Sequence, residues 1–117
     1  MIGETNLDTL LKSMLPELVE TEYVFCCIET TLLNVLRLEP IATFKEHEAL
    51  TVVISKQTAD AEGMQYDGVF KQITLTVHSS LNAVGLTAAV ATKLAEKGLS
   101  ANVIAAFYHD HIFVQTD

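Results

Sequence analysis

The residues best placed to do chemistry lie in the stretch His78–Gly85, which reads His-Ser-Ser-Leu-Asn-Ala-Val-Gly. A strand is expected before this stretch and a helix after it, so the first N–H groups of that helix lack partners within it. These N–H groups, together with the positive end of the helix dipole, suit a carboxylate. Gly85 has no Cβ and would let a ligand or another backbone approach closely. We therefore expect an anion-sized cleft at this turn, with the backbone of Val84 and Gly85 as donor.

The residues expected to line this cleft come from the turn, the first helical turn and the start of the next strand. They are His78, Ser79, Asn82, Val84, Gly85 and Asn102. A ligand carboxylate would lie on the N–H groups, and side-chain amides or carbonyls could hold an ammonium group of the same ligand. The alternative is structural: Ser79 and Ser80 only cap the helix, and Gly85 only eases helix–sheet packing.

A second polar cluster is His109-Asp110-His111. If a strand ran through it, both imidazoles would lie on one face and could share a metal ion. However, a two-residue hairpin turn favours Asp, and no fourth ligand is identifiable. We interpret the cluster as a polar turn at His109-Asp110, and we predict neither a metal nor a cofactor.

The two cysteines, Cys26 and Cys27, are adjacent, so a disulfide between them would be strained. A reactive thiolate needs a base or a positive environment, and the nearby charges, Glu22 and Glu29, are negative. We expect two packed thiols in a strand. No phosphate-binding loop, Ser-His-Asp spacing or paired-carboxylate motif is present, so the sequence predicts a protein that is not an enzyme.

Hydrophobic periodicity predicts the elements of the first half. They are an amphipathic helix at Leu7–Leu15, a strand at Tyr23–Ile28, strands at Ile41–Glu46 and Leu50–Ile54 around a turn at His47–Ala49, and a helix capped by Ser55 that runs through Glu62 and stops at Gly63. The segment Thr30–Leu38 fits a short helix or a loop with apolar anchors.

The second half begins with the clearest alternation of the chain, at Val69–His78. Such a strand of ~33 Å could serve two sheets, or could close one folded unit and open the next. A helix follows, with the buried stripe Ala83, Leu86, Val90 and Leu94, and it ends at Gly98. Strands at Asn102–Tyr108 and His111–Gln115 complete the pattern.

Composition excludes several classes of protein. Half of the 117 residues are hydrophobic and 19% are charged, which excludes intrinsic disorder. The net charge of −8 disfavours nucleic acid and anionic membranes as partners. No apolar run approaches the ~20 residues that span a bilayer, and the start lacks the features of a signal peptide. We expect a cytoplasmic protein.

The charge is unevenly distributed along the chain. Residues 1–67 hold 12 acidic and 4 basic residues, whereas residues 68–117 hold 3 of each. A neutral, apolar second half on an acidic protein suggests that another subunit covers part of its surface. We therefore expect a homodimer.

The stretch YDGVFKQITLTVHSSLNAVGLTAAVATKLAEKGLSANVIAAFYHDHIFV, with the earlier segments EYVFC, EPIATFKEHEALTVVI and KQTADAEG, carries a family resemblance. It resembles small bacterial proteins built from tandem ACT-type domains, relatives of the regulatory domains of aspartokinases. The resemblance implies a ferredoxin-like fold and regulation by small molecules, commonly amino acids, without catalysis.

Two features depart from that family. The frequent Pro-Gly pair is replaced by Val84-Gly85, which keeps the glycine, and the chain ends at Asp117, where relatives usually continue into a final helix. The leading helix or a neighbouring subunit could cover the sheet instead.

Together these observations predict an α+β protein of tandem ferredoxin-like ACT-type (βαββαβ) units, with antiparallel sheets, helices on one face and a truncated second unit. The predicted domains are residues 1–68, with the leading helix, and residues 69–117, a βαββ unit lacking its final helix. The predicted function is regulation through binding of an amino acid or similar zwitterion, which changes subunit or partner arrangement. The alternative is a ligand-free dimerisation scaffold of the same fold.

Overall fold

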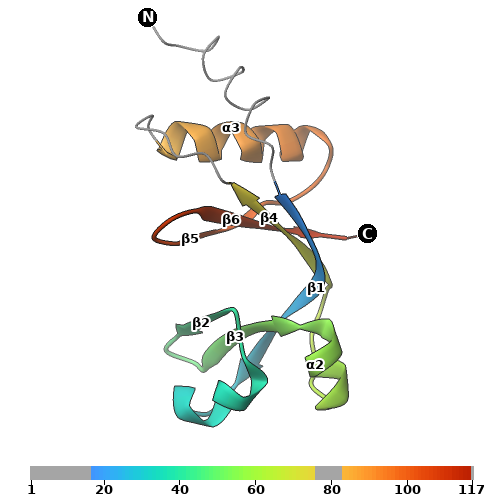
Figure 1. The fold of residues 1–117 in the computed structure, drawn as a ribbon, viewed down its shortest axis with the longest axis vertical. Helices are drawn as coiled ribbons and strands as arrows, with labels where there is room; N and C mark the ends of the chain where they lie inside the picture. The colour runs from blue at the N-terminus through green and yellow to red at the C-terminus, as the bar shows by residue number, and fades with distance from the viewer. Residues whose placement is uncertain (1–16, 76–82, 117) are drawn as a thin grey trace, which may run out of the picture. The chain divides into compact units, whose positions relative to one another are not determined.

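The structure is a computed structural model that describes residues 17–75 and 83–116, so the helix predicted at Leu7–Leu15 lies outside the described residues. The elements are β1 (Glu17–Ile28), η1 (Leu32–Leu38, a 3-10 helix), β2 (Ala42–Lys45), β3 (Leu50–Ser55), α2 (Lys56–Ala61), β4 (Phe70–Leu75), α3 (Ala83–Glu96), β5 (Asn102–Ala105) and β6 (Asp110–Gln115) (Figure 1). This mixture of antiparallel strands and few helices confirms the predicted α+β class.

The chain divides into two compact units, here called the first and the second unit. Among the described residues, the first comprises residues 20–71 and Thr116, and the second comprises residues 17–19, 72–75 and 83–115. The strand order is β2-β3-β1 in the first unit and β4-β6-β5 in the second. The residues of β4 are shared between the units, as expected for a strand that closes one unit and opens the next. The domain boundary at residue 68 stays a prediction.

The sheet of the first unit is antiparallel, with β3 between β2 and β1. Its register runs from Tyr23↔Ser55 to Ile28↔Leu50, and from Ala42↔Val53 to Lys45↔Leu50. Because side chains alternate along a strand, one face of β1 and β3 is buried as a continuous layer. That layer consists of Val24, Cys26, Leu50, Val52 and Ile54. The β1 strand thus confirms the prediction for Tyr23–Ile28 and begins earlier, at Glu17.

The segment that the sequence left open between helix and loop is the 3-10 helix η1. Three residues per turn place positions i and i+3 on one face, and Val35 and Leu38 are accordingly buried in the core of the first unit. The helix ends where Glu39 adopts a left-handed conformation (φ 50°) and donates its N–H to the carbonyl of Leu36. Pro40 then prevents continuation.

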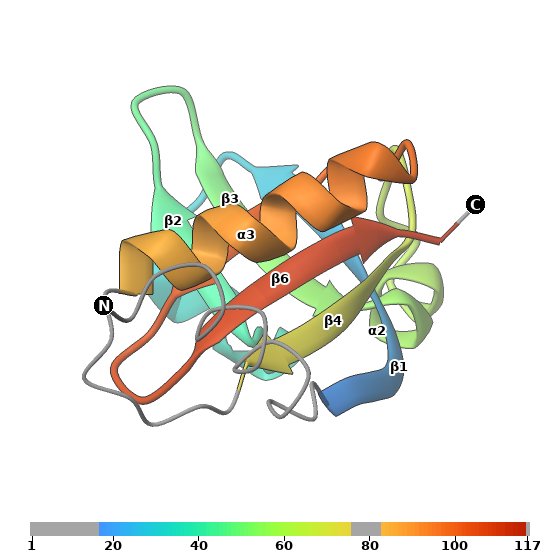
Figure 2. The ribbon, with the colours of Figure 1, turned by 90° about the horizontal axis from the view of Figure 1, so that it is seen from above.

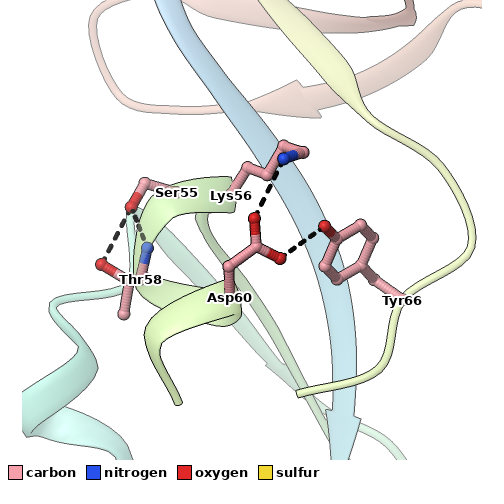
Figure 3. A network of polar contacts seen from close by, with 5 residues as sticks. All are labelled: Ser55, Lys56, Thr58, Asp60 and Tyr66. Carbon is pink, nitrogen blue, oxygen red and sulfur yellow. Dashed lines mark hydrogen bonds and ion pairs between the residues drawn. The ribbon is translucent and has the colours of Figure 1, made fainter. Parts of the chain in front are cut away.

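Helix α2 begins as the sequence predicts. The hydroxyl oxygen of Ser55 accepts a hydrogen bond from the N–H of Thr58 at 3.1 Å, which satisfies a free donor of the first turn (Figure 3). Gly63, with φ +68°, lies just beyond the end of the helix, in a conformation that favours glycine. Ala59 is fully buried against the core, so α2 and η1 pack on the same face of the sheet.

A polar network fixes the loop after α2 (Figure 3). The Asp60 carboxylate accepts hydrogen bonds from the Tyr66 hydroxyl at 2.7 Å and the Lys56 ammonium at 2.9 Å. These two bonds, first that of Tyr66, lower the pKa of Asp60 and favour its charged form. The loop that leads to β4 is thereby tied to the helix.

In the second unit, α3 covers one face of the strands (Figure 2). Val90 and Leu94 pack against a core formed by Leu75, Ile112 and Val114. The helix is followed by Gly98 at φ +78°, and the N–H of Leu99 donates to the carbonyl of Leu94. The predicted helix end and two residues of the predicted stripe are thus confirmed; the side chains of Ala83 and Leu86 lie outside the described ones.

The turn of the last hairpin differs from the prediction of His109-Asp110. Asp110 pairs with Ala105 inside β6, and the N–H of Ala106 donates to the carbonyl of His109. The turn therefore consists of Phe107 and Tyr108. The prediction followed the preference of Asp for turns, but strand pairing decides the register, and it places the apolar Ile112 and Val114 on the α3 face.

Among the helices of the described ranges, none is both long and apolar enough to cross a membrane.

Candidate functional site

Most of the predicted cleft lies where the structure gives no description. His78, Ser79 and Asn82 fall outside the described residues, and of Val84 and Gly85 only the backbone is described, in the first turn of α3. Asn102 begins β5, and its side-chain amide donates to the carbonyl of Phe113 at 3.1 Å. These six residues therefore remain a prediction.

The first unit contains the corresponding strand-to-helix turn, between β1 and η1, and this turn borders a cavity of about 520 Å³. A small molecule of amino-acid size fits such a volume. The lining comes from the end of β1, from the turn, from η1 and from the segment after α2. It consists of Cys26, Cys27, Ile28, Thr30, Asn34, Val35, Arg37, Leu38, Glu62, Met64 and Gln65.

Two opposite charges line this cavity. The Arg37 guanidinium donates to the Glu62 carboxylate at 2.7 Å, and their side chains are 66% and 39% exposed. An exposed ion pair of this kind contributes only ~0–1 kcal/mol to stability, so a ligand can exchange partners with it at small cost. The pair therefore offers one cation and one anion to a molecule that enters the cavity.

The remaining lining divides into a polar and an apolar part. At the turn, the Asn34 amide donates to the Thr30 hydroxyl at 2.9 Å. The apolar part of the lining consists of Val35 and Leu38, which are buried, and Met64, which packs against the same core. A ligand with one charged end and a small apolar group matches this division.

The two thiols at this site differ. Cys26 is buried, and burial raises the pKa of its thiol, which keeps it protonated. Cys27 is exposed, so the prediction that both thiols are packed is wrong for Cys27. The reason is that neighbouring residues of a strand point to opposite faces.

His111, on β6 of the second unit, contacts polar side chains of the neighbouring strand. The Nδ1 atom of His111 lies 2.9 Å from the amide nitrogen of Gln72 and 3.1 Å from the hydroxyl of Thr74, both on β4. Burial, and secondarily the charge of His109, lowers the pKa of His111. Across residues 17–75 and 83–116, no group of three or more His, Cys, Asp and Glu side chains could hold a metal ion.

Sequence reasoning did not find Arg37 and Glu62. They are 25 residues apart, and the structure of the segment that holds Arg37 was left open between helix and loop. The spacing of Val35 and Leu38 is a signal that could have placed Arg37. In a 3-10 helix these two residues share the buried face, so Arg37 lies off that face.

Comparison with known families now defines the class. Family models described as ACT domain match residues 2–71 and residues 70–117. The chain therefore belongs to the ACT-domain family, as two tandem ACT-type domains with a ferredoxin-like fold. ACT domains are generally regulatory ligand-binding modules rather than catalytic ones.

Among solved structures, the chain is similar to a crystal structure of a protein of unknown function from Vibrio cholerae, described as a possible transport protein. The identity is 57% and the TM-score 0.85, over 96% of this chain and 86% of the other. A comparison with curated proteins gives no match.

Proposed function

We propose that this protein binds a small amino acid or similar zwitterion and acts as a regulatory module, with the cavity of the first unit as a binding site. The observation that carries the proposal is the Arg37–Glu62 pair in the lining of a cavity of amino-acid size beside the strand-to-helix turn. Membership of a family of regulatory ligand-binding modules supports it.

The chemistry of the pair fits a zwitterion better than a simple anion or cation. A guanidinium can accept a ligand carboxylate through two parallel hydrogen bonds, and a carboxylate can accept from a ligand ammonium. A lone anion would leave Glu62 without a cation, and a lone cation would leave Arg37 without an anion. A ligand that carries both charges satisfies both side chains.

The predicted cleft around His78, Ser79, Asn82, Val84, Gly85 and Asn102 is the second site of the proposal. It belongs to the equivalent turn of the second unit, so two related sites per chain follow from the repeat of the fold. Ligand binding would change how the protein meets another subunit or a partner protein. A ligand can shift the protein from one arrangement to another only to the extent that it binds the second arrangement more tightly.

The test is a thermal-shift screen against the twenty amino acids, followed by calorimetric titration of any that stabilise the protein. A ligand at 100 times its Kd raises the free energy of unfolding by ~2.7 kcal/mol. We expect Arg37→Gln to weaken binding by roughly tenfold or more, because it removes a charge-assisted hydrogen bond.

The matched control is Lys56→Gln, which breaks the exposed Lys56–Asp60 pair of the same unit, outside the cavity lining. It should leave the affinity unchanged. If binding survives Arg37→Gln and is lost in Asn82→Ala, the site lies at the turn of the second unit instead. If no amino acid shifts the melting temperature, the proposal fails, and a ligand-free scaffold of the same fold replaces it.

A further inference from the structure

The 3-10 helix η1 has three faces, because residues i and i+3 lie one above the other in a helix of three residues per turn. The first face carries Val35 and Leu38, which are buried in the core of the first unit. The second face carries Asn34 and Arg37, which line the cavity of about 520 Å³. One short helix therefore reaches both the core and the candidate ligand site, and its third face remains.

The third face of η1 is apolar and turned towards solvent. It consists of Leu33 and Leu36, which are 76% and 54% exposed. Leu32, at the start of the helix, is 43% exposed. We call these three residues the leucine ridge. Val35 and Leu38 already anchor the helix to the core, and apolar side chains grouped on one exposed face are typical of a surface that binds another protein.

An acidic hollow of about 280 Å³ lies beside the first residue of the ridge, Leu32, which is part of its lining. The charged or titratable side chains of this lining are those of Glu29, Lys45, Glu46, His47 and Glu48. With histidine counted as neutral, three carboxylates face one ammonium. The hollow therefore favours a cation, and its place beside the ridge puts that cation next to an apolar contact.

The acidic character extends over the whole first unit. Residues 20–71 include nine acidic and four basic residues. Three of the four basic side chains, those of Arg37, Lys56 and Lys71, already form ion pairs with carboxylates of the same unit. A second copy of this chain would bring two acidic surfaces together, which is repulsive. Charge complementarity thus favours a basic partner for the ridge.

We propose that the leucine ridge and the acidic hollow together form a docking surface for a basic amphipathic helix of a partner protein. Apolar side chains spaced i, i+3 and i+4 on such a helix would pack on the ridge. A Lys or Arg at the border of its apolar face would enter the hollow and donate charge-assisted hydrogen bonds to the carboxylates. The apolar contact supplies affinity, and the opposite charges speed association and select the partner. This docking does not depend on ligand binding.

The same helix would let the partner sense the ligand, and this link rests on the proposed function. Arg37 and Leu36 are neighbours on η1, one in the cavity lining and one on the ridge. A ligand carboxylate that draws the guanidinium away from Glu62 therefore acts on the helix that carries the ridge. If the ligand changes the affinity for the partner, the partner must change the affinity for the ligand by the same factor.

The test is calorimetric titration of the full chain with a synthetic helical peptide of leucine and lysine, its leucines spaced i, i+3, i+4 and i+7. A peptide with glutamate in place of lysine is the charge control. We expect the lysine peptide to bind and the glutamate peptide not to bind. The variant that combines Leu33→Ser and Leu36→Ser should weaken binding by roughly tenfold or more, because two apolar side chains no longer become buried.

The matched control for the ridge is Phe44→Ser, which removes another apolar side chain that is 69% exposed in the same unit. Phe44 pairs with Thr51, whereas the neighbouring Leu50 and Val52 belong to the core beneath η1. Because side chains alternate along a strand, Phe44 lies on the opposite face of the sheet. Phe44→Ser should therefore leave the affinity for the lysine peptide unchanged.

A second pair of variants tests the hollow. Glu29→Gln combined with Glu48→Gln removes two of its carboxylates and should weaken binding of the lysine peptide by roughly threefold or more. The control is Glu22→Gln, since Glu22 lines a different cavity of the first unit. It should leave the affinity unchanged. Equal losses in the two variants would show that the overall negative charge attracts the peptide, and would overturn the role of the hollow.

The amide NMR shifts of the wild-type chain locate the bound peptide without any substitution. We expect changes at residues 32–39 and 46–48. The proposal is overturned if the lysine peptide does not bind, if the shifts change only elsewhere, or if Phe44→Ser weakens binding as much as the leucine variant. It is also overturned if sedimentation shows that the leucine variant dissociates a wild-type dimer, because a second copy would then occupy the ridge.

The link to the ligand is tested by repeating the titration with an amino acid that stabilises the protein. We expect the dissociation constant of the lysine peptide to change. An unchanged constant overturns the link and leaves the docking surface standing. If no amino acid stabilises the protein, the proposed function fails, whereas the peptide titrations without ligand still decide whether the ridge and the hollow bind a basic helix.

Discussion

The two hairpins, β2–β3 and β5–β6, have strands that begin 60 residues apart, and they agree in the positions that face their cores and differ in the positions that face outward. Val52 and Ile112, at equivalent places in β3 and β6, are both 0% exposed. The turns, in contrast, are His47-Glu48 in one hairpin and Phe107-Tyr108 in the other. Burial restricts the inward side chains to apolar types, whereas the outer positions are free to carry charge or aromatic surface.

The segments that follow the hairpins also differ. After β3, Ser55 caps α2, which contributes Ala59 to the core of the first unit. After β6, Gln115 is followed by Thr116, whose N–H donates to the carbonyl of Val69. In the described residues the first unit thus covers its sheet with two short helices and the second with the 14-residue α3.

The largest expected effect concerns the two cores. Ile54→Ala, at a site that is 0% exposed, should lower the free energy of unfolding by ~2–5 kcal/mol. The equivalent Val114→Ala, at 8% exposure, removes one carbon fewer and should cost about 2 kcal/mol. Urea unfolding followed by circular dichroism measures both. A larger loss for Val114→Ala would show that the second core contributes more than the first.

An intermediate effect is expected at the end of the hairpins. Ser55→Ala removes the cap of α2 and should destabilise the protein by ~1 kcal/mol. Gln115→Ala, at the equivalent position of β6, removes no cap and should stay within ~0.5 kcal/mol of the wild type. Ser55→Asp, which keeps an acceptor oxygen, should restore stability in the same urea titration. Equal losses in Ser55→Ala and Gln115→Ala would contradict the capping role.

The smallest effect concerns pH and distinguishes His111 from Thr51, its equivalent in the first hairpin. Because the native pKa of His111 is lowered, the unfolded chain binds a proton more readily than the native one. The free energy of unfolding should therefore fall as the pH drops below the ordinary histidine value of ~6.5 towards the native pKa. His111→Gln should remove this part of the pH dependence, whereas Thr51→Gln should keep it. An identical slope in His111→Gln and wild type, measured by urea titration from pH 8 to 5, would refute the assignment.

Some elements were predictable because their signals are local. Ser55 and Gly63 bracket α2, and Gly98 ends α3, because caps depend on a few adjacent residues. The turn at Phe107-Tyr108 was not predictable in this way. Two exposed aromatic residues are poor turn formers, and the pairing of β5 with β6 outweighs the local preference of Asp110.

The candidate site also combines features that local sequence signals predict with features that depend on tertiary packing. The sequence leads to the proposal of a ligand site at a strand-to-helix turn, because free N–H groups accompany the start of every helix, and zwitterion binding there stays a prediction. The ion pair of Arg37 and Glu62 was not predictable, since the two charges meet only after η1 and α2 pack on one sheet.

The amino-acid sequence alone determined the α+β class, the order of the six strands with α2 and α3, and the neutrality of the second half, because these depend on composition and on periodicities of a few residues. Only the tertiary structure decided which residues of η1 turn outward, which charges line the cavity and which of the two adjacent thiols is buried. Those properties depend on register and packing between segments far apart in the chain, where a shift of one residue reverses the face of every side chain.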